Sequence, residues 1–213
     1  MADEMIDVFD DGHNPLGVAS KSLAHRIGLW HHSIHCWMYG RQGDGGYLLF
    51  QKRGRDKELF PNALDISAAG HYQAGENVED GVREIAEELR LEVEFQAMRD
   101  LGLRTEVAKV GDKVNREFCH VYLLEVPLQS FEFDPDPGEV EGLVQIGVKE
   151  GLDLFSGRCN SARAEGIEFV GGEWQRFSSD VDTEWFIPRV DRYYYKMFML
   201  TSLALRGEED LAV

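Results

Sequence analysis

A helical apolar stripe over residues 77–89 is the feature that most constrains the fold of this chain. The stripe recurs every three or four positions and consists of Val78, Val82, Ile85, Ala86 and Leu89. Three carboxylates, Glu84, Glu87 and Glu88, would share the opposite arc of the same helix. Like charges at this spacing repel by ~0.2–0.5 kcal/mol per pair. The helix therefore needs an apolar surface on one side, and open solvent or a cation on the other.

Short segments rich in β-branched and aromatic residues indicate the surface on which this helix packs. We predict strands over residues 33–39, 47–52 and 118–126, and a closing helix over residues 186–205 with Pro188 in its first turn. Strands around a central helix, with a second helix late in the chain, predict an α/β or α+β layered domain. At 213 residues the chain is long enough for one buried core and short for two, so we expect a single domain over residues 1–213.

The charge balance and the cysteines limit the possible partners and compartment. The 22 Lys and Arg residues oppose 39 Asp and Glu residues, a net charge of −17 whose field repels polyanions, so we expect no nucleic-acid partner. No apolar run approaches the ~20 residues of a membrane-spanning helix, and the acidic N-terminus has no export signal. Cys36, Cys119 and Cys159 form neither a disulfide pattern nor a zinc motif. We expect a cytoplasmic protein with buried thiols and no membrane contact.

The three carboxylates have two interpretations, a solvated polar face or a site for a hard cation such as Mg²⁺ or Mn²⁺. The preceding segment favours the cation, because a glycine loop, residues 70–75, leads into the helix and allows close approach of the backbone to a ligand. Four basic residues lie shortly before that loop: Lys52, Arg53, Arg55 and Lys57. Arg and Lys bind phosphate oxygens, although for Lys52 a solubilising turn is an equal alternative.

Residues 70–91 resemble the signature of the Nudix hydrolases, which reads Gly, five residues, Glu, seven residues, then Arg-Glu-apolar-x-Glu-Glu-x-Gly-apolar. Gly70, Glu76 and the run 83–89, Arg-Glu-Ile-Ala-Glu-Glu-Leu, match it. Two positions depart: the second spacer has six residues here, and Arg90 replaces the closing Gly, so either Arg90 accepts a left-handed conformation or the helix continues. The resemblance implies an α/β/α sandwich with a mixed central sheet and a signature loop-helix. It leaves a short N-terminal extension, about residues 1–20, and a C-terminal helical extension, about residues 182–213.

Residues 28–37 and 65–71 resemble the branch of the family that contains isopentenyl-diphosphate isomerase and its hydrolase-like relatives. Ala69 stands where the isomerase has a catalytic Cys, and Asn115 stands where it has a metal-binding Glu, whereas its second catalytic Glu is matched by Glu117. Isomerase chemistry therefore looks lost. The histidines His25, His31, His32, His35, His71 and His120 could form a transition-metal site. For His31, His32 and His35 we favour packing and hydrogen bonds, and His71 either supports the loop or contacts substrate.

The resemblance implies a metal-dependent hydrolase that cleaves the phosphoanhydride bond of a small organic diphosphate. Glu84, Glu87 and Glu88 would hold Mg²⁺ or Mn²⁺, and Arg83 would orient one of them. The general base would be one of the signature glutamates or a carboxylate from a later loop, for which Glu139 is the candidate and Glu117 the second choice. The residues expected to bind substrate are Arg53, Arg55, Lys57 and His71. The alternatives are an isomerase-like enzyme and a non-catalytic ligand-sensing module.

Aromatic residues concentrate beyond residue 160, where the resemblance ends: Trp174, Trp185, Phe186, Tyr193, Tyr194, Tyr195 and Phe198. Consecutive tyrosines cannot all share one helix face, so at least one of Tyr193, Tyr194 and Tyr195 should point away from the core. Aromatic rings on a closing helix are more often core than ligand platform, so we expect core or dimer packing. The remaining tyrosine implies that the helix either lines the substrate cleft or forms a homodimer contact. Arg189 and Arg192, one helical turn apart in this prediction, would bind phosphate or acidic groups.

Overall fold

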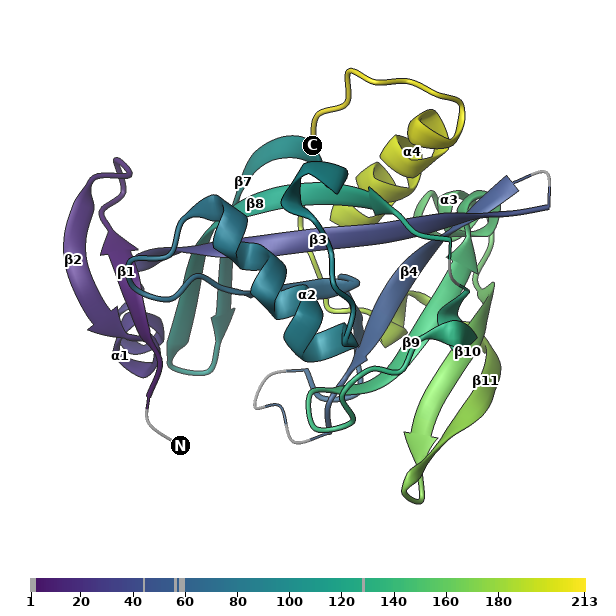
Figure 1. Ribbon diagram of the computed structural model, residues 1–213, viewed down its shortest axis with the longest axis horizontal. Helices are drawn as coiled ribbons and strands as arrows, with labels where there is room; N and C mark the ends of the chain where they lie inside the picture. Colours follow the sequence, from purple (N-terminus) through teal and green to yellow (C-terminus); the bar gives the residue numbers. More distant parts are fainter. Residues whose placement is uncertain (1–2, 44, 56, 58–59, 128) are drawn as a thin grey trace.

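Eleven strands join into one mixed sheet in the computed structural model, which describes residues 3–43, 45–55, 57, 60–127 and 129–213 (Figure 1). The main path runs through β11 (Glu173–Val181), β10 (Ala162–Val170), β9 (Val140–Gly147), β4 (Gly45–Arg53), β3 (Trp30–Gln42), β1 (Met5–Phe9) and β2 (Pro15–Ser20). Four strands lie off this path: β5 (Leu64–Asp65), β6 (Ala68–His71), β7 (Arg99–Val110) and β8 (Lys113–Glu125). The β3–β8 pair is parallel and the other named strand pairs are antiparallel, which confirms the mixed sheet.

Strand β3 organises the sheet because it is long enough to pair with several strands. One edge pairs with β8 from Trp30 to Tyr39, while the other edge meets β1, β6 and β4 in turn. All three predicted strands exist and are longer than expected, since each extends past its apolar centre into half-buried or exposed residues. The pairing of β3 with both β6 and β8 brings the glycine loop and the segment around Glu117 to the same region.

Alternation along β3 sends side chains into two separate cores. Trp37 and Tyr39 join the core that includes α3 (Val148–Phe155) and α4 (Tyr193–Leu205). Cys36 and Met38 join the core that includes α2 (Val82–Leu89). Helices therefore cover both faces of the sheet, and the α/β/α arrangement is confirmed (Figure 1). Among the described residues, no helix is long and apolar enough to cross a membrane.

Shorter elements complete the fold. Helix α1 (Lys21–Ile27) follows β2, and single 3₁₀ turns occur at η1 (Val78–Gly81), η2 (Phe95–Ala97), η3 (Ser130–Glu132) and η4 (Thr183–Trp185). The N-terminal extension is part of the sheet, since β1 pairs with β3 and Ala74 N donates to Met5 O (2.8 Å). Asp7 also accepts a hydrogen bond from Gly75 N (2.8 Å), so β1 supports the glycine loop.

The predicted start of the closing helix was wrong. Helix α4 begins at Tyr193, and Phe186 and Pro188 precede it in a segment that pairs with β5, where Ile187 N donates to Leu64 O (3.3 Å). Proline lacks the N–H of a helix interior, and buried contacts of Arg189 with β5 and β7 hold the segment extended. Arg189 and Arg192 therefore do not lie on one helix face.

The tyrosine prediction is confirmed. Tyr193 and Tyr194 are buried, whereas Tyr195 is half-buried under the Arg192 guanidinium, 4.4 Å from its ring centre. Tyr195 is not among the described residues that line the cavity containing the α2 glutamates. The remaining tyrosine therefore does not have the cleft-lining role that was one of its two expected roles. Arg192 also donates to the Phe155 carbonyl (3.3 Å), which fixes the start of α4 on α3.

A change of helix type compensates for the signature spacer, which is one residue shorter than in the family pattern. Residues 78–81 form the 3₁₀ turn η1, capped by Asn77, and α2 starts only at Val82. A 3₁₀ helix rises about 2.0 Å per residue against about 1.5 Å in an α-helix, so fewer residues span the same distance. The predicted helix over residues 77–89 is thus two consecutive pieces that keep the carboxylates on one arc.

Arg90 ends α2 in the left-handed conformation (φ 51°, ψ 35°), which settles the alternative left open by the sequence. This conformation costs a non-glycine residue about 1 kcal/mol. The ion pairs of Arg90 with Asp134 (3.4 Å) and Asp136 (3.6 Å) are exposed and contribute little to the free energy of unfolding. We expect Arg90→Gly to raise the melting temperature by about 2–4 °C. Arg90→Ala, which loses the ion pairs and keeps the strain, is the control, and an Arg90→Gly protein less stable than it would contradict this explanation.

Candidate active site

A cavity of about 930 Å³ collects most of the residues proposed from the sequence. Its lining includes Arg53, Lys57, His71, Arg83, Glu84, Glu87, Glu88, Glu117 and Glu139. These residues come from β4, β6, β8, α2 and the loops after β4 and before β9. Arg55 is the exception: it does not line the cavity but forks onto both carboxylate oxygens of Glu141. The prediction that Arg55 contacts substrate therefore has no support from its position.

Glu84 and Glu88 form the buried part of the carboxylate cluster. Glu88 Oε2 accepts hydrogen bonds from Gln51 Nε2 and Ala69 N, both at 3.2 Å. Burial, followed by repulsion from Glu84, raises the pKa of Glu88 to about 8. Burial also raises the pKa of Glu84. A Cβ at Gly70 would lie 2.1 Å from the Glu84 carboxyl group, so only glycine allows this approach.

Arg83 bridges the carboxylates. Its guanidinium nitrogens lie 3.0 Å from Glu76, 2.8 Å from Glu84 and 2.8 Å from Glu87. Arg83 therefore holds the glycine loop against α2 and orients two of the three cluster glutamates. Glu87 is the most exposed of the three, with 56% of its side chain accessible, and faces open solvent at the cavity edge.

The carboxylates present a donor set that fits a divalent cation. Hard oxygen ligands on one helix arc suit Mg²⁺ or Mn²⁺. A nearby cation would stabilise the Glu88 carboxylate and so offset the desolvation and the repulsion from Glu84 that raise its pKa. Cations of the protein also line the cavity. Arg53 lies 3.5 Å from Asp65, and Lys57 lies 2.7 Å from Glu139. The arrangement can bind an anion through Arg53 and Lys57 while a metal lies between that anion and the glutamates.

Three histidines and Glu117 form a second candidate metal centre. One nitrogen each of His25, His31 and His71 lies within 4.8 Å of the others, and the buried Nε2 atoms of His25 and His31 have no hydrogen-bond partner among the described residues. Glu117 Oε1 lies 3.2 Å from His71 Nε2 and 4.0 Å from His31 Nε2. Burial lowers the pKa of His25 and of His31 to about 4, so both rings are neutral and able to act as ligands.

Packing alone does not account for His31. Its Nδ1 contacts the Leu29 carbonyl (3.1 Å), but the unpartnered Nε2 faces His71 and Glu117. His32 and His35 do make the expected hydrogen bonds, His32 with His13 and His120, and His35 with Tyr193. The sequence gives no local motif for the cluster because its members come from α1, β3, β6 and β8.

Both chain extensions add lining residues that sequence reasoning missed. The N-terminal part supplies Glu4 and Lys21, which form an ion pair at 2.9 Å. The C-terminal part supplies Ile187 and Arg189. Arg189 was noted only as a helix-face cation, whereas it is buried and pairs with Asp65 (2.7 Å) and Glu106. No spacing signal marks these residues, because each reaches the cavity through long-range packing.

Acid should weaken the fold through His35, which is 3% exposed. Burial, followed by Arg189, lowers the pKa of His35 to about 3, against about 6.5 in the unfolded chain. The unfolded state therefore binds more protons as pH falls below 6.5, and stability is lost down to about pH 3. We expect His35 to account for a loss of about 2 kcal/mol in unfolding free energy between pH 7.5 and 5.0. Urea titrations at both pH values test this, with His35→Gln as the non-titrating control. Equal pH slopes for the two proteins would contradict it.

Comparison with known proteins agrees with the fold. The NUDIX domain model matches residues 29–153. An uncharacterized Nudix hydrolase of Clostridium acetobutylicum is 35% identical over 198 residues, which cover 91% of this chain and 95% of that protein. An isopentenyl-diphosphate Delta-isomerase of Cutibacterium acnes is 29% identical over 71% of this chain and 78% of its own. A crystal structure of a Deinococcus radiodurans protein has a TM-score of 0.55 at 23% identity and covers 72% of this chain and 90% of its own.

The family model covers more than half of the chain, and the clostridial relative aligns with nearly all of it. Nudix hydrolases generally depend on a divalent metal, which agrees with the carboxylate arc of α2. The chain belongs to the Nudix family and is a Nudix pyrophosphohydrolase.

Proposed function

We propose that this enzyme cleaves the phosphoanhydride bond of a small organic diphosphate with Mg²⁺ or Mn²⁺ held by Glu84, Glu87 and Glu88. The observation that carries the proposal is the placement of these carboxylates in one cavity with Arg53, Lys57 and Arg83. When bound, the metal supplies charge neutralisation at the phosphate oxygens and lowers the pKa of bound water. The products are two phosphorylated fragments, or inorganic phosphate and a monophosphate.

Phosphate binding, positioning of the glutamates and proton transfer are assigned to different side chains. Arg53 and Lys57 bind the phosphate oxygens, and Arg83 keeps Glu84 and Glu87 in place through its two 2.8 Å contacts. Glu139 accepts a proton from the attacking water, since it lines the cavity and its partner Lys57 can turn to the phosphate. Glu117 is the weaker base: burial alone would raise its pKa, but His71 and the nearby histidines hold that pKa well below the usual range.

Isomerisation of isopentenyl diphosphate is the alternative suggested by relatives with that name. The histidine cluster and Glu117 favour it, but Ala69 offers no proton donor. Incubation of the enzyme with isopentenyl diphosphate separates the two activities. Phosphate release without dimethylallyl diphosphate supports hydrolysis, and formation of dimethylallyl diphosphate would overturn it.

Activity should be lost when metal is removed. The glutamates and an anionic diphosphate repel each other unless a cation lies between them. We expect excess chelator to reduce phosphate release to the uncatalysed rate, and Mg²⁺ or Mn²⁺ to restore it. A panel of diphosphates with and without chelator measures this. Full turnover in chelator would exclude the proposed role of α2.

A further inference from the structure

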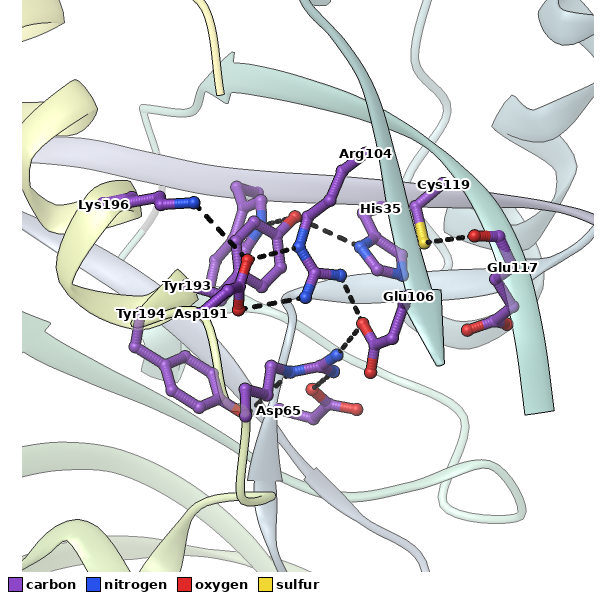
Figure 2. Close-up of polar contacts among 12 residues, drawn as sticks. His35, Asp65, Arg104, Glu106, Glu117, Cys119, Asp191, Tyr193, Tyr194 and Lys196 are labelled. Carbon is purple, nitrogen blue, oxygen red and sulfur yellow. Dashed lines mark hydrogen bonds and ion pairs between the residues drawn. The ribbon is translucent and has the colours of Figure 1, made fainter. Parts of the chain in front are cut away.

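One part of the cavity lining consists of buried or largely buried polar side chains from four segments. We call this the inner wall, made by Ser33, His35, Asp65, Glu106 and Arg189. Ser33, His35 and Asp65 are each at most 5% exposed, and the Arg189 side chain is 6% exposed. Figure 2 shows the polar contacts around this wall, which run from Lys196 through Asp191 and Arg104 to Glu106.

A hydrogen-bond chain behind the wall fixes the proton of His35. Trp37 Nε1 donates to Tyr193 Oη (2.9 Å), which lies 3.1 Å from His35 Nδ1 (Figure 2). An indole nitrogen can only donate, and His35 Nδ1 is the acceptor that the described residues place within reach of the buried Tyr193 hydroxyl proton, so we assign that proton to the bond with His35 Nδ1. The neutral ring then carries its own proton on Nε2. His35 therefore presents an N–H donor on the side opposite Tyr193, where the cavity lies.

Hydrogen-bond acceptors lie next to this donor. Arg104 and Arg189 both donate to Oε2 of Glu106, so Oε1 has no partner among the described residues. A ring nitrogen of His35 and a carboxylate oxygen of Glu106 lie within 4.8 Å of each other. Ser33 Oγ is buried, and its polar neighbour among the described residues is the Cys119 thiol. A substrate hydroxyl can accept from His35 and donate to Glu106 at the same time, which an alkyl carbon cannot do.

The described lining offers little aromatic surface on which a nucleobase could stack. Among the described lining residues, Phe60 carries the only benzene ring, and the other aromatic groups are histidines. Bases are usually bound by stacking on aromatic faces. An aliphatic chain would also bind poorly, because it would leave the His35 Nε2–H group and Glu106 Oε1 without hydrogen-bond partners.

We propose that the inner wall binds a hydroxyl-bearing, non-aromatic group, so that the substrate is a sugar or polyol diphosphate. The proposal rests on the proposed hydrolase function. For a terminal diphosphate, water attacks the outer phosphorus and the anhydride P–O bond breaks. The products are inorganic phosphate and the sugar or polyol monophosphate.

Three diphosphates with matched five-carbon groups test the proposal on the full chain with Mg²⁺: ribose 5-diphosphate, ADP and n-pentyl diphosphate. ADP adds a base to the same sugar, and n-pentyl diphosphate keeps five carbons without a hydroxyl. We expect kcat/KM for ribose 5-diphosphate to exceed both others by at least about tenfold. Equal or faster cleavage of ADP or n-pentyl diphosphate would overturn the proposal and leave the hydrolase function intact. Absence of cleavage for these three and for a wider diphosphate panel would overturn both.

Two buried hydroxyl groups provide matched variants. Ser33 belongs to the cavity lining, whereas Thr201 in α4, whose hydroxyl is also buried, lies outside the described lining. We expect Ser33→Ala to lower kcat/KM for ribose 5-diphosphate at least about fivefold and to leave n-pentyl diphosphate within twofold. Thr201→Val should change neither. Equal effects of Ser33→Ala on both substrates, or no effect, would remove the inner wall from substrate selection.

Discussion

We expect Glu87→Gln and Glu88→Gln each to lower kcat by at least about a hundredfold, because each would remove a proposed metal ligand whose contribution to transition-state stabilisation is several kcal/mol. The fold should survive both changes. Glutamine at position 88 keeps an acceptor for Gln51 and Ala69 and removes a carboxylate whose pKa burial raises to about 8. Phosphate-release kinetics and thermal melts of the same protein samples measure the two effects separately.

Glu79→Gln is the control for these variants. Glu79 lies in η1, one turn before α2, is exposed, and does not line the main cavity. It should keep the wild-type kcat and its Mg²⁺ dependence. If Glu88→Gln also kept the wild-type kcat, the metal would have to lie elsewhere, and the cluster of His25, His31, His71 and Glu117 would be the next position to test.

The carboxylate site could be predicted because its determinants are local. Spacing along one helix places Glu84, Glu87 and Glu88 on one arc whatever the rest of the chain does, and the apolar stripe of Ile85 and Leu89 sets which arc faces the core. Even the departure at Arg90 could be reduced to two outcomes, since a helix either ends there or continues. The structure shows that the helix ends, with Arg90 in the left-handed conformation.

The rest of the cavity depends on pairing between distant strands, which spacing cannot give. His31 meets Glu117 because β3 pairs with β8 in parallel, and β6 adds His71 to the same region. The basic segment that contains Arg55 does contribute residues to the cavity lining, as predicted. The Arg55 side chain, however, contacts Glu141 at the start of β9. A charge run predicts where cations gather, but the partner of each cation depends on tertiary contacts.

The contacts of the C-terminal extension could likewise be predicted only in part. Aromatic content indicated core packing, and Tyr193, Met197 and Phe198 are indeed fully buried against β3, β4 and α3. What composition could not show is that the extension also brings a cation to Asp65 and Glu106, two carboxylates with little access to solvent. The extension is thus part of both the core and the cavity wall.

Truncation after Asp182 should therefore abolish folding. It removes α4 and exposes the apolar surfaces of β3, β4 and α3 that Tyr193, Tyr194 and Phe198 cover. Loss of one large core side chain costs about 3–5 kcal/mol, and loss of several exceeds the stability of a typical domain. We expect insoluble protein, or a chain without a cooperative thermal transition by circular dichroism. A truncated protein that stays soluble and melts cooperatively would contradict the role of α4 in the core.

Arg189→Met separates the electrostatic contribution of the extension from its apolar packing. The methionine keeps most of the aliphatic volume, but it leaves Asp65 and Glu106 without the guanidinium between them. Removing one partner of a buried ion pair costs about 3–5 kcal/mol when the remaining charge is left uncompensated. Because Arg53 still lies 3.5 Å from Asp65 and Arg104 still donates to Glu106, we expect a loss at the lower end, about 3 kcal/mol. Lys196→Met breaks the half-exposed pair with Asp191 (3.5 Å) and should cost less than about 1 kcal/mol. If urea titrations gave equal losses for the two variants, Arg189 would act only as packing, and the charge network would contribute nothing to the attachment of the extension.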